Sequence, residues 1–174
     1  MFNTNRLLSF SIQRWLLGLI IMLRFTKKLP ICNNIEMTEK TAIQLKGNMS
    51  FEISLDGHKF MIDSSEEFGG ENKGPKPKSL MLAALGGCTG MDMASMLRKM
   101  RVVFEDLKIE VSGEITEEHP KHFESMHITY IIKGKDLPRE KIEMAIDLSQ
   151  NKYCGVSYTY RDSIKITHDL IITE

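Results

Sequence analysis

Two cysteines are the residues of this chain whose type and placement favour chemistry. Cys88 lies inside a long apolar stretch, and Cys154 follows much later, in the segment Asn-Lys-Tyr-Cys-Gly. The remaining cysteine, Cys32, lies near the N-terminus. Three cysteines are too few for the disulfide framework of a secreted scaffold. They are typical of an intracellular chain whose thiols are either reactive or simply buried.

The sequence around Cys88 predicts a buried helix. Between residues 79 and 97 the only charge is Asp92, and basic residues flank the run on both sides. Apolar side chains recur at helical spacing on nearly every face, which is typical of a helix in the middle of a structure. Glycine costs about 1 kcal/mol in a helix relative to alanine. We therefore expect another backbone to approach closely beside Cys88, at Gly86, Gly87 and Gly90.

Two plainer interpretations of this stretch stay open from the residues alone. One is a core helix that carries an unreactive, buried Cys88, which is where free cysteines are commonly found. The other is a membrane-spanning helix, because the run is about long enough to cross a bilayer. Asp92 and the three glycines make the second interpretation poor.

The rest of the pattern predicts an α+β domain. Alternating apolar residues predict strands at residues 43–45, 51–55, 60–62, 107–111, 126–132 and 164–172. A second helix opens at Pro138, and Gly155 is expected to end it in a left-handed cap, which places Cys154 in its last turn. Three strands, a long helix, two strands, a helix and a last strand form one α+β fold.

A glycine-rich loop at residues 64–78 leads into the long helix. It also holds two prolines and three glutamates. Loops held by a rigid scaffold often carry functional residues. We therefore expect site residues in this loop.

Residues 1–36 do not match the pattern that follows. Nine apolar residues from Trp15 to Leu23 lie between two arginines, and this is far fewer than the roughly 20 that span a membrane. The segment has the charge of a signal peptide but no small-x-small cleavage site follows. We expect residues 1–36 to be a leader, disordered or an over-extended gene start with translation at Met37, and residues 37–174 to be a single domain. A membrane tether is the alternative if the leader is real.

Composition narrows the function further. A chain of 174 residues with zero net charge is long enough for one well-packed domain. It has no basic stripe with interleaved aromatic residues, so a nucleic-acid partner is not expected. His119 and His122 flank a proline in a turn, with no cysteine close in sequence, so no metal site is expected. No bound cofactor is expected in this chain. We expect a cytoplasmic protein.

The long helix also predicts an oligomer. Its apolar surface runs all the way round, and one small sheet covers only part of it. An obligate homodimer would close over the other side, with the glycines beside Cys88 facing a second helix.

Three segments together resemble the OsmC/Ohr family of osmotically induced and organic-hydroperoxide-resistance proteins, and its OsmC-like branch most. They are GGENKGPKPKSLMLAALGGCTGMDMASMLRKMR, EEHPKHFESMHITYIIKG and NKYCGVS. The resemblance covers Met37 to the C-terminus. It implies an intertwined homodimer in which antiparallel sheets surround a long central buried helix, with a second helix beside it.

The resemblance also implies roles for the two cysteines. Cys88 would be peroxidatic, attacking the hydroperoxide, and Cys154 would resolve it to a disulfide, with a small dithiol or a lipoyl group as reductant. A thiolate performs the attack and a nearby thiol converts the sulfenic acid. In the predicted last turn of a helix, Cys154 would face the negative end of the helix dipole, which disfavours its thiolate.

The chain departs from the family where the peroxidatic thiol is activated. The peroxidases use an Arg from the N-terminal strands, held by a Glu. Here Ser50 stands where related chains often carry that Arg, and Lys78 stands where the Ohr branch has an acid. Glu71 is the best remaining acidic candidate. Asp92, one turn after Cys88, would raise the pKa of that thiol.

These residues lead to two expected functions. The first is a thiol-dependent peroxidase that reduces organic hydroperoxides in defence against oxidative stress. The second is an OsmC-like dimeric module with little peroxidase activity, which binds a small hydrophobic or electrophilic ligand.

Overall fold

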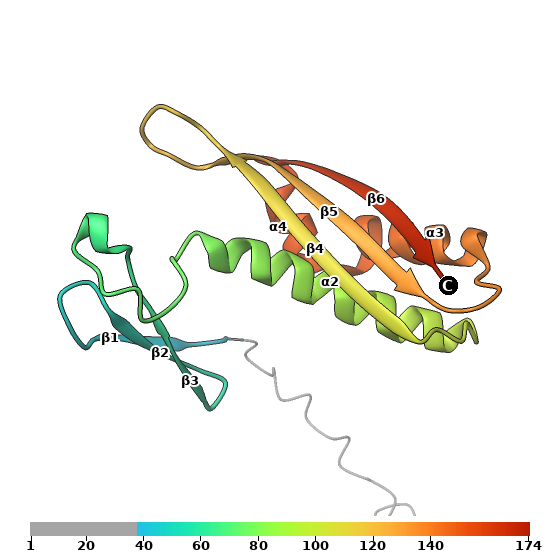
Figure 1. The fold of residues 1–174 in the computed structure, drawn as a ribbon, viewed down its shortest axis with the longest axis horizontal. Coiled ribbons are helices and arrows are strands. Elements are labelled where there is room, and N and C mark those ends of the chain that lie inside the picture. The colour runs from blue at the N-terminus through green and yellow to red at the C-terminus, as the bar shows by residue number, and fades with distance from the viewer. Residues whose placement is uncertain (1–37) are drawn as a thin grey trace, which may run out of the picture. The chain divides into compact units, whose positions relative to one another are not determined.

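The structure is a computed structural model that describes residues 38–174, and residues 41–174 form one compact unit. The predictions for the leader, Cys32 included, lie outside the described residues. Figure 1 shows the elements in chain order. They are β1 (Thr41–Leu45), β2 (Phe51–Leu55), β3 (His58–Ile62), η2 (Glu66–Phe68), α2 (Ser79–Lys99), β4 (Asp106–Ile115), β5 (Phe123–Lys133), α3 (Arg139–Leu148), η3 (Ser149–Tyr153), α4 (Gly155–Tyr160) and β6 (Lys165–Thr173).

The first three strands form an antiparallel sheet in the order β1-β2-β3. The predicted hairpin between β2 and β3 is confirmed, because Leu55 pairs with His58 and only Asp56 and Gly57 lie between them. Both turn residues have positive φ, 50° and 78°. This backbone suits the twist of the two strands, and Asp-Gly is a preferred sequence for it.

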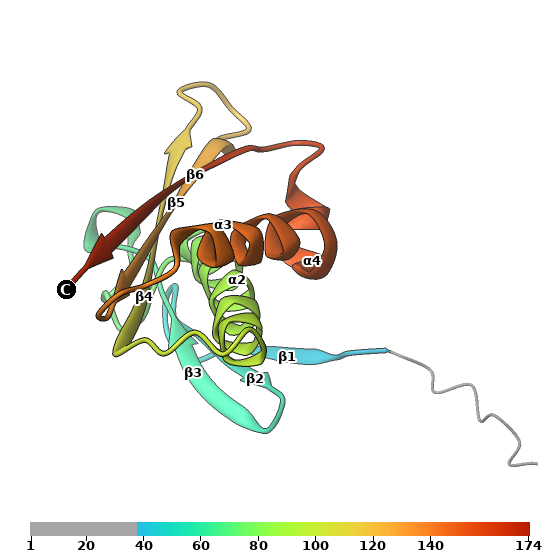
Figure 2. The ribbon, with the colours of Figure 1, turned by 90° about the vertical axis from the view of Figure 1, so that its right-hand side faces the viewer.

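The second sheet has the order β4-β5-β6 and holds the core. Its first pair is antiparallel, as expected, but β5 and β6 are parallel. The expectation of purely antiparallel sheets is therefore corrected at this pair. The cause is the helical connection between the two strands. The chain leaves the C-terminal end of β5, runs through α3, η3 and α4, and returns to the end of the sheet where β5 begins, so β6 runs in the same direction as β5. Figure 2 shows the helices on one face of this sheet.

Helix α2 packs along that face, and its predicted burial is confirmed on one side. Leu85, Met93 and Leu97 have no exposed surface. A Cβ added at Gly86 would lie 3.0 Å from Val111 Cγ2 of β4, so this glycine lets the helix approach the sheet. The close neighbour of the glycine is thus a β4 side chain of the same chain, which corrects the expectation of another backbone.

The opposite side of α2 is exposed within the single chain. Met91 is 72% exposed, and nothing lies within 4 Å of a Cβ added at Gly87. The exposed strip consists of small or apolar residues: Ala83, Ala84, Gly87, Met91 and Ser95. By length and composition α2 is the one helix among residues 38–174 that could cross a membrane. Its other side packs on the second sheet and belongs to the core.

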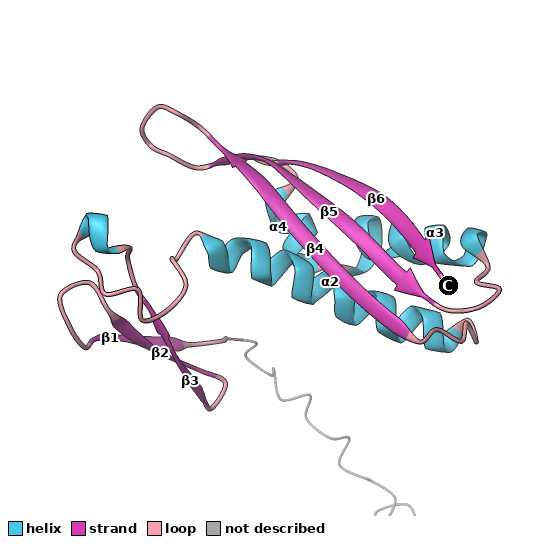
Figure 3. Cartoon of the chain, in the orientation of Figure 1, coloured by secondary structure: helices cyan, strands magenta, loops and turns pink. Residues whose placement is uncertain are grey.

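The second helical region differs from the prediction. It starts after Pro138 as expected, but α3 ends at Leu148 and continues as the π-helical turn η3. Cys154 is extended, with φ −71° and ψ 102°, and Gly155 begins the separate helix α4. The expected left-handed cap at Gly155 is therefore wrong. Figure 3 shows the three helical segments between β5 and β6.

Candidate active site

The two cysteines come from separate elements and both are free thiols. Cys88 lies in the middle of α2 and is half-buried, whereas Cys154 lies between η3 and α4 and is 2% exposed. The Cys154 Sγ accepts a hydrogen bond from the Ser157 N–H, at 3.4 Å. It thereby caps the first turn of α4.

This position corrects the expected placement of Cys154. The thiol lies at the start of α4 and not in the last turn of the helix before it. The sequence pattern predicted one continuous helix from Pro138 that included Cys154. The π turn ends that helix earlier, and no local pattern indicates such a turn.

Asp92 joins the two thiols. It lies one turn after Cys88 on α2, and the two sulfurs and a carboxylate oxygen all lie within 4.8 Å of one another. The Asp92 Oδ2 accepts the Ser149 hydroxyl at 3.0 Å. Three of the five residues proposed from the sequence are therefore brought together, from α2 and from the η3–α4 junction.

A buried chain of hydroxyl groups leads away from Asp92. Ser149 Oγ lies 3.0 Å from Thr89 Oγ1, which lies 2.7 Å from the Tyr130 hydroxyl, and Gln150 Nε2 donates to that hydroxyl at 3.0 Å. The two ends of the chain fix the direction in which the hydroxyl groups donate, because the Gln150 NH2 only donates and the Asp92 carboxylate only accepts. Each hydroxyl therefore donates toward Asp92. Sequence reasoning missed this chain, although Thr89 is a polar residue in a run otherwise read as apolar.

The pKa of the Cys88 thiol is raised above its ordinary value. Burial is the main cause, followed by the hydrogen bond with Cys154, and the negative charges of Cys154 and Asp92 add to it. The Val156 N–H, from the first turn of α4, acts in the opposite direction. The surroundings within one chain therefore hold Cys88 as a thiol near neutral pH.

The other two candidates lie apart from this cluster. Glu71 forms an ion pair with Lys73 in the loop before α2, and Lys78 Nζ donates to the Lys121 carbonyl at 3.2 Å. Among residues 38–174, Asp92 has no partner in an ion pair.

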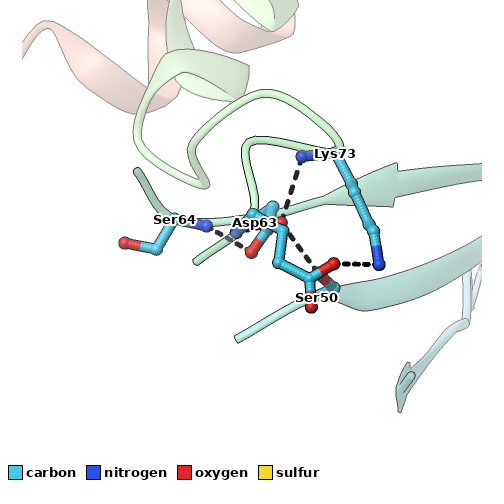
Figure 4. Close-up of polar contacts among 5 residues, drawn as sticks. Ser50, Asp63, Ser64 and Lys73 are labelled. Carbon is cyan, nitrogen blue, oxygen red and sulfur yellow. Dashed lines mark hydrogen bonds and ion pairs between the residues drawn. The ribbon is translucent and has the colours of Figure 1, made fainter. Parts of the chain in front are cut away.

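Ser50, where related chains often carry an Arg, has a structural role. Its hydroxyl donates to Asp63 Oδ2 at 2.7 Å, and both residues are 1% exposed. Figure 4 shows Asp63 at the start of the loop, facing Ser50 and the backbone of Ser64 and Lys73. Asp63 accepts the backbone N–H groups of Ser64, Glu71 and Lys73 at 2.7 to 3.0 Å. One carboxylate thus holds the whole entry to α2.

The pKa of Asp63 is lowered to about 2. Burial alone would raise it, but the hydrogen bonds donated by Lys73, Ser50, Glu71 and Ser64 outweigh burial because they all stabilise the charged form. Asp63 was not among the residues proposed from the sequence. Its signal was the position directly after an alternating strand and before a glycine-rich loop.

The fold and the site define a class: an α+β protein in which a cysteine in a long core helix meets a second cysteine from a distant segment. The chain belongs to the OsmC-like protein family, whose model matches residues 70–169. The suspected OsmC/Ohr membership is confirmed.

Known relatives agree with this assignment. The Escherichia coli K12 protein YhfA is 33% identical over 115 residues, which cover 66% of this chain and 83% of YhfA. A hypothetical protein from Aquifex aeolicus VF5 has a similar structure, with a TM-score of 0.67 and 29% identity over 79% of this chain and 98% of that one. The organic hydroperoxide resistance protein OhrB of Bacillus subtilis shares the fold, with a TM-score of 0.54 and 21% identity over 76% and 97% of the two chains.

Substitution of Asp63 by Asn tests the role of this carboxylate in stability. The pKa of Asp63 is depressed in the folded state, so its contribution to stability is present above the unfolded pKa near 4 and is lost as the pH falls toward 2. We expect Asp63→Asn to lower the unfolding midpoint at pH 7 and to flatten its pH dependence between 4 and 2. Urea unfolding followed by circular dichroism measures both.

The exposed strand residue Glu124 provides the control, because Glu124→Gln removes a carboxylate that the structure places at the surface. An Asp63→Asn protein with the wild-type midpoint and the wild-type pH profile would contradict the proposed anchoring.

Proposed function

We propose that this protein is a thiol-dependent hydroperoxide reductase that uses Cys88 and Cys154. The observation that carries the proposal is the proximity of two free cysteine sulfurs, within 4.8 Å, from segments far apart in sequence. Formation of a disulfide needs Cα atoms within about 7 Å and little movement of sulfur. The organic hydroperoxide resistance of relatives such as OhrB supports the same chemistry.

The reaction proceeds in two thiol steps. The Cys88 thiolate attacks one oxygen of ROOH, so that an S–O bond forms, the O–O bond breaks and ROH leaves after taking up a proton. Cys88 is now a sulfenic acid. The Cys154 sulfur attacks the Cys88 sulfur, an S–S bond forms, and the hydroxyl leaves as water with the Cys154 proton. A small dithiol or a lipoyl group then reduces the disulfide to two thiols by exchange.

Activation of Cys88 rests on the start of α4 in this proposal. The Val156 N–H favours its thiolate, while Asp92 and burial oppose it. Cys154 receives the neighbouring N–H from Ser157. The two sulfurs therefore lie beside consecutive N–H groups of one helical turn, those of Val156 and Ser157.

We also propose a homodimer in the cytoplasm. The support is the exposed strip of α2 defined above, whose apolar and small residues would be covered by a second copy of the chain. Met91, at 72% exposure, is the largest apolar side chain in that strip. Association of like helices is favourable where small residues allow close contact and apolar area is buried.

Ligand binding is the second candidate, and a specific pocket favours it. A cavity of about 730 Å³ lies between the N-terminal sheet, the loop and the start of α2. Its lining combines apolar side chains with three lysines and two acids: Phe51, Ile62, Phe68, Phe123, Lys76, Lys78, Lys121, Asp63 and Glu117. Neither cysteine lines it. A small hydrophobic molecule with an anionic group suits such a lining.

Treatment of the reduced full-length chain with one equivalent of cumene hydroperoxide tests the first candidate. A Cys32→Ser background leaves Cys88 and Cys154 as the only thiols. We expect a Cys88–Cys154 disulfide within seconds, no reaction in Cys88→Ser, and arrest at the sulfenic acid in Cys154→Ser. Mass spectrometry with a thiol-blocking reagent measures each species. Two thiols that stay reduced for many minutes would refute the peroxidase and leave the ligand-binding candidate.

Removal of the Asp92 charge should make Cys88 more reactive. Asp92 raises the pKa of Cys88, so Asp92→Asn lowers that pKa and increases the thiolate fraction at pH 7. We expect alkylation of Cys88 by iodoacetamide to become several-fold faster. The control Asp162→Asn removes the same charge at an exposed position and should leave the rate unchanged. A slower or unaltered rate in Asp92→Asn would contradict the electrostatic effect.

Substitution of Met91 by Glu tests the proposed dimer. The free energy needed to bury a glutamate on this strip would exceed the free energy gained by association. We therefore expect a dimer for the wild type and a monomer for Met91→Glu in multi-angle light scattering. Met144, 57% exposed on α3, offers the matched control Met144→Glu, which should stay dimeric. A wild-type monomer at micromolar concentration would remove the dimer from the proposal.

A further inference from the structure

We propose that the reduced thiol site is also a zinc site, with Cys88 Sγ, Cys154 Sγ and an Asp92 carboxylate oxygen as ligands and water in the fourth position. Binding is confined to the reduced protein, because a Cys88–Cys154 disulfide removes two of the three ligands. The metal and the disulfide are therefore mutually exclusive states of one site.

The distances place all three donor atoms within reach of one ion. Three points that lie within 4.8 Å of one another share a centre no farther than about 2.8 Å from each. Zinc binds thiolate sulfur at about 2.3 Å and carboxylate oxygen at about 2.0–2.2 Å. Shifts of about 0.5 Å for each sulfur and about 0.6–0.8 Å for the oxygen bring all three atoms to these distances.

The donor set selects the metal. Two thiolates exclude hard cations such as Mg²⁺ and Ca²⁺, which prefer oxygen ligands, and the carboxylate is a poor ligand for Cu(I). A mixed set of two sulfurs and one oxygen suits a tetrahedral, borderline-soft ion. Three protein ligands with one open position are typical of zinc sites that are not purely structural.

The surroundings orient each ligand, as metal sites require. The Ser149 hydroxyl donates to Asp92 Oδ2 at 3.0 Å and thereby fixes the carboxylate. Ser149 in turn contacts the buried hydroxyl of Thr89. On the other side of the site, the Ser157 N–H holds Cys154 Sγ. These contacts exist without the metal, so the ligands are positioned before it binds.

Charge also favours a dication at this site. The Asp92 carboxylate lies with the two sulfurs, and no Lys or Arg among residues 38–174 forms an ion pair with it. A divalent cation would attract the carboxylate and both sulfurs at once.

A cavity reaches the carboxylate ligand of the site. A cavity of about 280 Å³ is lined by Asp92 together with Ser95, Lys99 and Tyr153. Cys88 is itself half-buried and not closed off. Zinc can therefore enter and leave without unfolding of the domain.

The experiment measures zinc on the reduced chain in the Cys32→Ser background, without any peroxide. Competition with a chromophoric chelator gives the affinity, and cobalt as a spectroscopic substitute reports thiolate ligation through its sulfur-to-metal charge-transfer band. We expect one ion per chain. We also expect an affinity at least ~100-fold weaker in Cys88→Ser and Cys154→Ser, and about tenfold weaker in Asp92→Asn. Glu124→Gln, which removes an exposed carboxylate on β5, is the control and should bind like the wild type.

Two results on the reduced protein would overturn the zinc site. One is equal zinc affinity of the wild type and the Cys88→Ser, Cys154→Ser double variant. The other is a cobalt spectrum of the wild type without a thiolate band, which needs no variant to fold. Because no peroxide is used, a failed peroxidase reaction leaves this result intact. Oxidation of the zinc-loaded wild type by diamide, a thiol oxidant, should release the ion, and retention of zinc by the disulfide form would also refute the proposal.

Discussion

The chain of hydroxyl groups that ends on Asp92 is the interaction on which the rest of this structure depends. It joins α2, β5 and η3 in the middle of the core through Thr89, Tyr130 and Ser149, all of which have no exposed surface. A buried hydroxyl without a partner costs about 1–3 kcal/mol, so the three elements must meet in one register to satisfy all of them. The same register places Cys154 against Cys88. The thiol pair is thus a consequence of how the polar core is satisfied.

The π turn η3 follows from this constraint. Within this wider turn, two consecutive residues, Ser149 and Gln150, both contact the hydroxyl chain. π turns occur frequently at functional sites for this reason, since they redirect a side chain without ending the helical path. The turn then leaves Cys154 extended, and α4 starts directly after it.

Much of the fold could be predicted from the sequence because its signals are local. The Asp56-Gly57 hairpin, the alternation in β5 and the apolar run of α2 each depend on neighbouring residues. The parallel pairing of β6 could not, since a strand's partner and direction are set by the path of the chain through α3 and α4. The residues of the site likewise fall into those that local sequence spacing indicates and those that it does not. Asp92 follows Cys88 by one helical turn and was found from spacing, whereas Asp63 and Ser149 act through contacts between distant segments that no spacing encodes.

The anchored loop at residues 64–78 changes what its glycine content means. In isolation such a segment would sample many conformations, and closing it would carry an entropic cost. Here its backbone folds back so tightly that a side chain at Gly70 or Gly74 would collide with the backbone of Ser64 or Met61. The glycines thus serve close packing around one carboxylate. The glycines, which elsewhere make a backbone flexible, here allow the close packing that makes this loop rigid. From its composition alone the loop would be predicted to be flexible.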